Sequence, residues 1–162
     1  MFSLGIVYNP HRFAGLAAVF ILLGLAVSSS ASAQQHQVSW HSFEEALQEA
    51  NQNNKLVVVD VWAPWCGWCH KMKKESYPAL PDKLTDQFIF TRLNRDDHET
   101  DYKYKGKSLT SMRLAQKLNA QAVPTVVILS PDGDYLFHIS GFLNTDKLQS
   151  MLLKTLQVTS RQ

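Results

Sequence analysis

The sequence predicts an α/β domain in which a mixed central β-sheet carries helices on both faces. Apolar, β-branched runs alternate along the chain with segments whose apolar residues recur at helical spacing, which is the pattern of a sheet covered by helices. The turn signal Pro131-Asp132-Gly133 follows the last long apolar run and predicts that the final two strands form a hairpin. The sheet should therefore contain both parallel and antiparallel neighbours.

Each element follows from a local pattern. Ser42 and Glu45 form a capping box at the start of the first helix, and Asn144 caps the last helix. A further helix should begin near Cys66 and run towards Tyr77. The remaining expected elements are strands over 38–40, 55–62, 88–94, 124–129 and 135–139, and helices over 43–50 and 110–118.

The composition is that of an ordinary globular domain. The chain has 162 residues, of which 45% are hydrophobic and 19% charged, and its net charge of +2 gives no indication of a nucleic-acid partner. Arg95 to Ser108 is polar and charged, so we expect a solvated loop or insertion there. The tail after Val158 is expected to fray.

The N-terminus has the pattern of a secretory signal peptide. His11 and Arg12 precede Phe13 to Val27, an apolar run of 15 residues, and Ala31-Ser32-Ala33 is a small-x-small cleavage pattern. The run is shorter than the ~20 residues that a membrane-spanning helix needs. We expect residues 1–33 to be removed after Ala33 and the domain over residues 34–162 to be periplasmic. An uncleaved N-terminal anchor is the alternative.

The two cysteines of the chain, Cys66 and Cys69, lie directly after an apolar strand and at the predicted start of a helix. A disulfide that closes so small a loop adds little stability, so reactivity explains the pair better than structural cross-linking does. Helix N-termini stabilise thiolates, and cysteine pKa values of ~3.5–7.5 occur in such motifs. Cys66 is therefore expected to be the exposed nucleophile that attacks a substrate disulfide, and Cys69 the more buried thiol that resolves the mixed disulfide.

The segment VVVDVWAPWCGWC resembles the active-site strand and turn of the thioredoxin superfamily, and the resemblance covers most of Trp40 to Leu156. It is most similar to the periplasmic thioredoxin-like thiol:disulfide interchange group. The resemblance implies a thioredoxin fold and a thiol–disulfide oxidoreductase that needs no cofactor. It also implies that Asp60 is a buried acid that accepts the Cys69 proton, and that Val123-Pro124 is the cis-proline segment beside Cys66 that binds the substrate chain.

Other interpretations of these residues stay open at the level of sequence. Asp60 could lie exposed at the end of its strand. Pro124 could be a trans proline that starts an edge strand, because only the resemblance favours cis. Arg92 lies where the family can have a lysine near the buried acid, and a solvated strand arginine is the alternative. Gly141 matches the glycine before the family's last helix.

The motif also departs from the family. The residues between the cysteines are Gly67 and Trp68, in place of Gly-Pro in thioredoxin or Gly-His in disulfide isomerase, and His70 replaces the usual lysine. Trp65 and Trp68 flank the thiols, so they either pack against the domain or form an apolar rim that contacts partners beside Gly67. The dipeptide leaves the reduction potential open.

The direction of electron flow is predicted by elimination. A valine before the cis-proline also occurs in periplasmic disulfide oxidants, but those proteins carry a large helical insertion for which this chain has little room. The isomerases of that compartment need a dimerisation domain. We therefore expect a monomeric reductase of protein disulfides that receives electrons from a membrane donor of the disulfide interchange type.

Two other classes of protein compete with this interpretation. Residues 66–70 spell C-x-x-C-H, the attachment motif of c-type haem, for which Met112 or Met151 could be a distal ligand while Met72 is too close. The four β-branched strands argue against the helical fold that haem requires. Alternatively, the two cysteines and His70 could bind copper or zinc.

Overall fold

The computed structural model describes residues 38–160, which lie in one compact unit that spans Gln35–Gln162. The predicted signal peptide and its cleavage site lie outside the described residues. Among the described helices, none combines the length and the apolar character that a membrane crossing requires.

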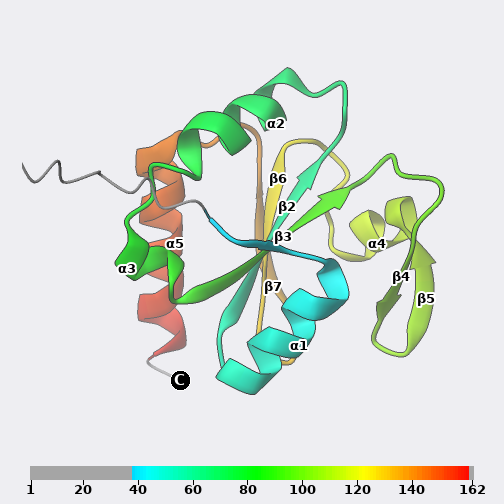
Figure 1. Cartoon of the computed structure of the whole chain (residues 1–162), viewed down its shortest axis with the longest axis horizontal. Coiled ribbons are helices and arrows are strands. Elements are labelled where there is room, and N and C mark those ends of the chain that lie inside the picture. The colour runs from blue at the N-terminus through cyan, green and yellow to red at the C-terminus, as the bar shows by residue number, and fades with distance from the viewer. Residues whose placement is uncertain (1–37, 161–162) are drawn as a thin grey trace, which may run out of the picture. The chain divides into compact units, whose positions relative to one another are not determined.

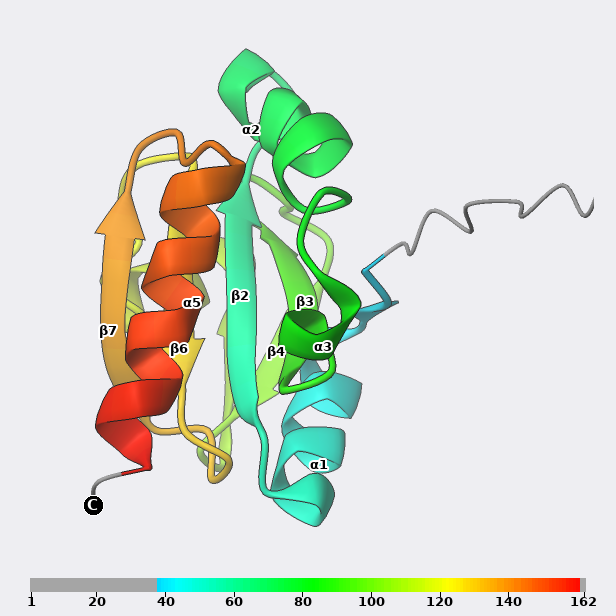
Figure 2. The ribbon, with the colours of Figure 1, turned by 90° about the vertical axis from the view of Figure 1, so that its left-hand side faces the viewer.

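The core of the domain is a five-stranded mixed sheet in the order β1-β3-β2-β6-β7 (Figures 1 and 2). The β1–β3 and β3–β2 pairs are parallel, and the β2–β6 and β6–β7 pairs are antiparallel. The predicted mixed sheet and its closing hairpin are therefore confirmed. The strands are β1 (Trp40–His41), β2 (Leu56–Trp62), β3 (Phe88–Asn94), β6 (Thr125–Leu129) and β7 (Tyr135–Ser140).

Helices cover both faces of this sheet, which Figure 1 shows almost edge-on. On one face, α1 (Phe43–Asn53) and α4 (Ser111–Lys117) pack against alternate residues of β2 such as Val57 and Val59. On the other face lie the π-helical turn η1 (Met72–Ser76), α3 (Asp82–Thr85) and α5 (Thr145–Thr159), packed against Leu56 and Val58. The short helix α2 (Gly67–Lys71) stands beyond the carboxyl end of β2 and runs directly into η1 (Figure 2).

The predicted caps are confirmed, and several boundaries move. Ser42 and Glu45 form both hydrogen bonds of the capping box, and the Asn144 side chain accepts a hydrogen bond from the Lys147 N–H at 3.0 Å. The first strand begins two residues later than predicted, and α1 continues to Asn53. The helix α3 was not predicted, because its four residues are too few to show a periodic pattern.

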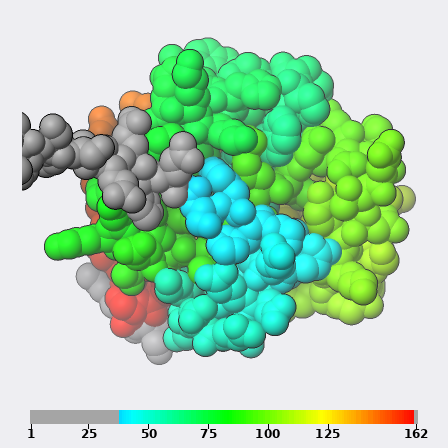
Figure 3. All heavy atoms as spheres, in the orientation of Figure 1, coloured from blue at the N-terminus to red at the C-terminus, as the bar shows by residue number. Residues whose placement is uncertain are grey.

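The prediction of a solvated loop over residues 95–108 is wrong for its second half. This part forms a hairpin of β4 (Asp101–Tyr104) and β5 (Lys107–Thr110), whose turn residues Lys105 and Gly106 have φ angles of 51° and 75°. Tyr102 and Tyr104 pack edge-on against Phe43 of α1, with ring centroids 5.9 and 5.8 Å away. The hairpin lies beside α1 in Figure 3. Its many charged residues, which alternate with the tyrosines, concealed the strand pattern.

Candidate active site around Cys66 and Cys69

The two cysteines form a disulfide at the start of α2, as the motif predicts. Their sulfur atoms are 2.00 Å apart and their Cα atoms 5.3 Å apart. Cys66 is the N-cap residue of α2, and its sulfur accepts a hydrogen bond from the Cys69 N–H at 3.1 Å. A backbone donor at this position stabilises negative charge on the Cys66 sulfur, which is the form that attacks a disulfide.

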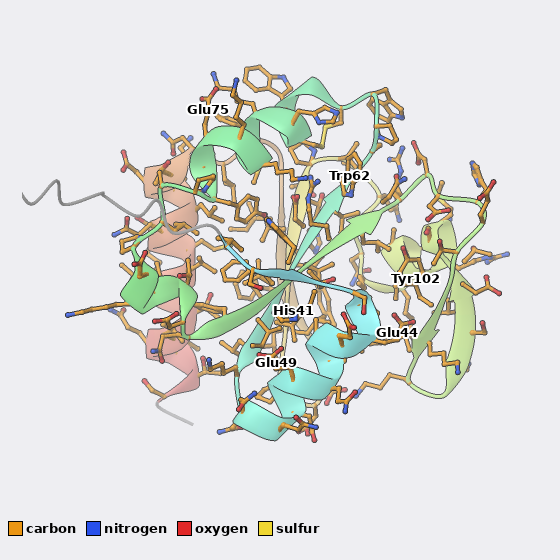
Figure 4. All side chains as sticks on the ribbon, in the orientation of Figure 1. His41, Glu44, Glu49, Trp62, Glu75 and Tyr102 are labelled. Carbon is orange, nitrogen blue, oxygen red and sulfur yellow. A yellow bond between two sulfur atoms is a disulfide. The ribbon has the colours of Figure 1, made fainter. Side chains whose placement is uncertain are left out.

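The turn between β2 and α2 is held by local hydrogen bonds. The Cys66 N–H donates to the Ala63 carbonyl at 3.0 Å. The His70 ring Nε2 lies 2.8 Å from the Pro64 carbonyl oxygen, and the same ring is edge-on to Trp62 at 5.8 Å. Figure 4 shows Trp62 at the end of β2, close to α2. His70 therefore secures the turn that carries Cys66.

Cys66 is less exposed than predicted. It is 4% exposed and Cys69 is fully buried, so the expected order of accessibility holds but both sulfurs are sheltered. Ala63, Trp62 and Val123 pack against the pair. The shelter arises because these apolar neighbours close around the bonded sulfurs.

Two exposed tryptophans flank the disulfide. Trp65 is 67% exposed and Trp68 is 59% exposed, so neither belongs to the core, although each contacts the domain surface. The Trp68 ring lies against Phe142 at a centroid distance of 5.0 Å, and Lys71 Nζ is 5.8 Å from the Trp68 centroid. Phe142 was not identified from the sequence, because it becomes part of the site only through the β7–α5 connection.

Trp65 is held by the loop that follows β3. Its indole Nε1 donates to Asp96 Oδ2 at 2.7 Å, and Arg95 binds both oxygens of that carboxylate at 2.7 and 3.3 Å. Arg95 Nη1 also donates to the Gln121 carbonyl at 2.8 Å. Arg95 and Asp96 therefore connect the cysteine loop to the segment before β6. Sequence reasoning placed both residues in a solvated loop and missed this role.

The segment Val123–Pro124 lies beside the disulfide. The peptide bond between the two residues is cis, Pro124 is buried, and Val123 packs against the cysteine cluster. The Pro124 carbonyl accepts a hydrogen bond from the Gly141 N–H at 2.8 Å, and Gly141 has a φ angle of 102°, which favours glycine. These contacts place the segment next to Cys66 and tie it to the end of β7.

Asp60 is fully buried in β2, so the alternative of an exposed strand end is wrong. Its Oδ2 accepts a hydrogen bond from Arg92 Nε at 2.7 Å, and the guanidinium of Arg92 lies 4.4 Å from the Trp62 ring centroid. Arg92 is therefore not a solvated strand residue. Burial raises the pKa of Asp60, and the positive charge of Arg92 opposes that rise.

The geometry of the site can be compared with what a c-type haem protein and a metal-binding module would require. Both sulfurs are shielded by apolar neighbours and the described residues form a sheet-centred domain, whereas haem attachment requires both sulfurs to reach the porphyrin edge. Met151 is buried between α5 and the sheet, and Met112 lies on α4. Within residues 38–160, no group of three or more His, Cys, Asp or Glu side chains is arranged to hold a metal ion.

The α/β fold and a buried disulfide at a helix N-terminus define a thioredoxin-like thiol–disulfide oxidoreductase. The chain belongs to the thioredoxin-like domain family, whose model matches residues 43–156. It is 30% identical to thioredoxin H1 of Arabidopsis thaliana over 78% of this chain and 98% of that protein. It is 28% identical to the thioredoxin of Porphyra purpurea over 73% of this chain and 94% of that protein.

Further matches include a partial one and two solved structures. A Caenorhabditis elegans protein is 35% identical over 63 residues, and the match covers 9% of that protein. The structure of a Thermus thermophilus thioredoxin matches with a TM-score of 0.57 and 19% identity, over 75% of this chain and 88% of that one. A structure described as DsbH oxidoreductase matches with a TM-score of 0.55 and 16% identity, over 80% and 94% of the two chains. At these identities the two structures support the fold.

Proposed function

We propose that this protein is a periplasmic reductase of protein disulfides. The observation that carries the direction is the environment of the Cys66 sulfur. Within residues 38–160 this sulfur accepts one hydrogen bond, from the Cys69 N–H, while the nearby His70 ring contacts the Pro64 carbonyl. A strong oxidant owes its potential to a stabilised reduced form. In the described part of the chain the backbone N–H of Cys69 stabilises this sulfur without a charged side-chain donor beside it, so the reduced form lacks the additional stabilisation of a strong oxidant, which favours the reducing direction.

The reaction has two exchange steps. The Cys66 thiolate attacks one sulfur of the substrate disulfide, the substrate S–S bond breaks, and the departing sulfur takes the electron pair and a proton. Cys69 then transfers its proton to the Asp60 carboxylate and attacks Cys66 Sγ. The bond between Cys66 and the substrate breaks, and the second substrate sulfur leaves as a thiolate that takes a proton from water, while Asp60 returns its proton to water. The substrate disulfide is reduced, and the Cys66–Cys69 disulfide is formed.

The surface around Cys66 suits an extended substrate chain. Val123 and Pro124 lie beside the disulfide, and backbone groups at such a position can pair with an extended peptide. Gly67 is exposed, and a Cβ atom added there would meet nothing within 4 Å, so the surface next to Cys66 is open. The exposed rings of Trp65 and Trp68 border this surface and would bury apolar area when a substrate binds.

The Cys69→Ser variant tests the exchange chemistry. It should accumulate mixed disulfides between Cys66 and its substrate proteins, because the resolving thiol is missing. The matched variant Cys66→Ser should trap none. Mass spectrometry of the adducts would identify the partners, and equal, background recovery from both variants would contradict a dedicated exchange role.

The reduction potential tests the direction. We expect a value at or below about −200 mV against glutathione, whereas a value near −120 mV is that of a strong oxidant and would reverse the assignment. Localisation is tested separately by cell fractionation and by the mass of the purified protein, which should begin at Gln34. If a membrane protein supplies the electrons, Cys66 and Cys69 should be reduced in intact cells, and alkylation of the two thiols would show this. In size-exclusion chromatography the protein should elute as a monomer.

A further inference from the structure

Three buried polar atoms around Asp60 have no hydrogen-bond partner within residues 38–160. They are Asp60 Oδ1, the Tyr77 hydroxyl and Arg92 Nη2. A buried polar group without a partner is costly, and such groups in folded proteins are almost always satisfied by protein or by ordered water. A fourth such atom, Ser111 Oγ, lies apart from them on α4, so three of the four gather around one carboxylate, which points to a shared role.

The three groups lie on the sheet face covered by the helix that follows the cysteines. Arg92 is the register partner of Asp60 on the neighbouring strand β3. Side chains alternate along β2, so Asp60 points to the same face as Val58, which packs in one cluster with Tyr77. Tyr77 is the C-cap residue of η1, which continues α2 directly. Tyr77 therefore belongs to the same continuous segment as Cys69.

The chemistry of the three groups is complementary. Arg92 Nη2 can only donate a hydrogen bond, the Tyr77 hydroxyl has a proton to donate, and Asp60 Oδ1 is the free acceptor. The hydroxyl lies close enough to Asp60 to influence its pKa, yet it stops short of a well-formed hydrogen bond. Burial raises the pKa of Tyr77 well above 10, so its proton stays in place at physiological pH.

We propose that Tyr77 is a positioning residue for the exchange reaction, whose hydroxyl donates a hydrogen bond to Asp60 Oδ1, directly or through one water. Arg92 holds the other oxygen, Oδ2. The inference rests on the proposed function in one respect, namely that Asp60 accepts the proton of Cys69.

A donor on Oδ1 favours the ionised form of Asp60, which is the form that can accept a proton. The other groups that face Asp60 are Arg92 and, at longer range, Lys73 on η1. Arg92 does not lose its proton in proteins, so its charge is constant and Asp60 alone changes state. Without the Tyr77 donor, Asp60 stays protonated to a higher pH. In the pH range where Asp60 is protonated, it cannot accept the proton of Cys69.

The test compares Tyr77→Phe with Tyr104→Phe. Tyr104 is also buried, and its hydroxyl donates to the Gly133 carbonyl at 2.8 Å, on the opposite face of the sheet. In Tyr77→Phe the midpoint of the Asp60 ¹³Cγ titration, measured by NMR, should move to higher pH. Resolution of a Cys66 mixed disulfide should slow about tenfold on the acid side of that midpoint, the size expected for one lost hydrogen bond to a charged group. Tyr104→Phe should leave both values unchanged.

An unchanged Asp60 midpoint in folded Tyr77→Phe would overturn the inference, because a merely structural tyrosine would lower stability without moving that titration. If Tyr77→Phe does not fold, the alternative measurement is the ¹³Cζ chemical shift of Tyr77 in the unsubstituted protein, followed as a function of pH. That shift should follow the Asp60 titration, and a flat curve would overturn the inference. Asp60→Asn separates the two proposals: unchanged resolution there refutes the proton-acceptor role of Asp60 but not the Tyr77 contact.

Discussion

The contact between Trp65 and Asp96 leads to a quantitative prediction about the rim of the site. Asp96→Ala removes the 2.7 Å hydrogen bond from the indole and leaves Arg95 without its carboxylate partner. A hydrogen bond to a charged group contributes about 1.5–3 kcal/mol, and the partial exposure of Asp96 lowers this value. We therefore expect the free energy of unfolding to fall by about 1–2 kcal/mol.

The assay is urea denaturation followed by tryptophan fluorescence, with Asp97→Ala as the matched control. Asp97 is the neighbouring residue, and its carboxylate accepts hydrogen bonds from the Glu99 and Thr100 N–H groups instead of from Trp65. Asp96→Asn should lose less stability than Asp96→Ala, because an amide oxygen can still accept the indole hydrogen bond. Equal stability of Asp96→Ala and the unsubstituted protein would refute the reasoning.

The same variant has an expected effect on activity and on pH dependence. A released Trp65 should lower kcat/KM for a protein disulfide about threefold to tenfold and leave the rate with a small disulfide unchanged, since about 1 kcal/mol corresponds to fivefold. Hydrogen bonds from Arg95 and Trp65 lower the pKa of Asp96 below 3.8. This stabilisation is present above pH 3.8 and is lost as the pH falls through the folded-state pKa. Asp96→Ala should lack this acid-dependent loss.

Two further predictions concern the neighbouring groups. Burial raises the pKa of Asp60 above 3.8, so the folded protein binds this proton more tightly than the unfolded chain, and stability should fall as the pH rises from 3.8 through the folded-state pKa. Asp60→Asn should remove that slope in urea denaturation at several pH values, and an unchanged slope would assign it to other groups. In a double-mutant cycle, Trp68→Ala and Phe142→Ala should show a coupling energy of about 0.5–1.5 kcal/mol, from their ring contact at 5.0 Å. Strictly additive effects would show that this contact contributes nothing.

The reactive pair and most of the sheet could be predicted because their signals are local. Cys66 and Cys69 stand between a continuous apolar run and a helix start, and β3 was predicted at its observed bounds of Phe88–Asn94. The capping box of α1 likewise depends on two residues that are three positions apart. Such patterns are complete within one segment, so no knowledge of the tertiary structure is needed to detect them.

Asp96 and Phe142 were missed as parts of the site because their roles depend on distant segments. Asp96 follows β3 and contacts Trp65 from 31 positions away in the chain. Phe142 reaches Trp68 only because β7 ends beside the cysteine loop. The hairpin β4–β5 was hidden because charged residues occupy the exposed positions of β4 and begin β5. A closer test for alternation would have found Tyr102 and Tyr104 on one side of it.

The sequence by itself determined the chemistry of this protein: two thiols at a helix start, a carboxylate in the preceding strand and a proline segment further along. The tertiary structure alone decided the environment of each group. Asp60 is buried beside Arg92 and Tyr77, Cys66 is sheltered by Trp62 and Val123, and Trp65 is held by the loop after β3. The physical reason is that reactivity follows from residue type, whereas burial and hydrogen bonding depend on which segments the fold brings together.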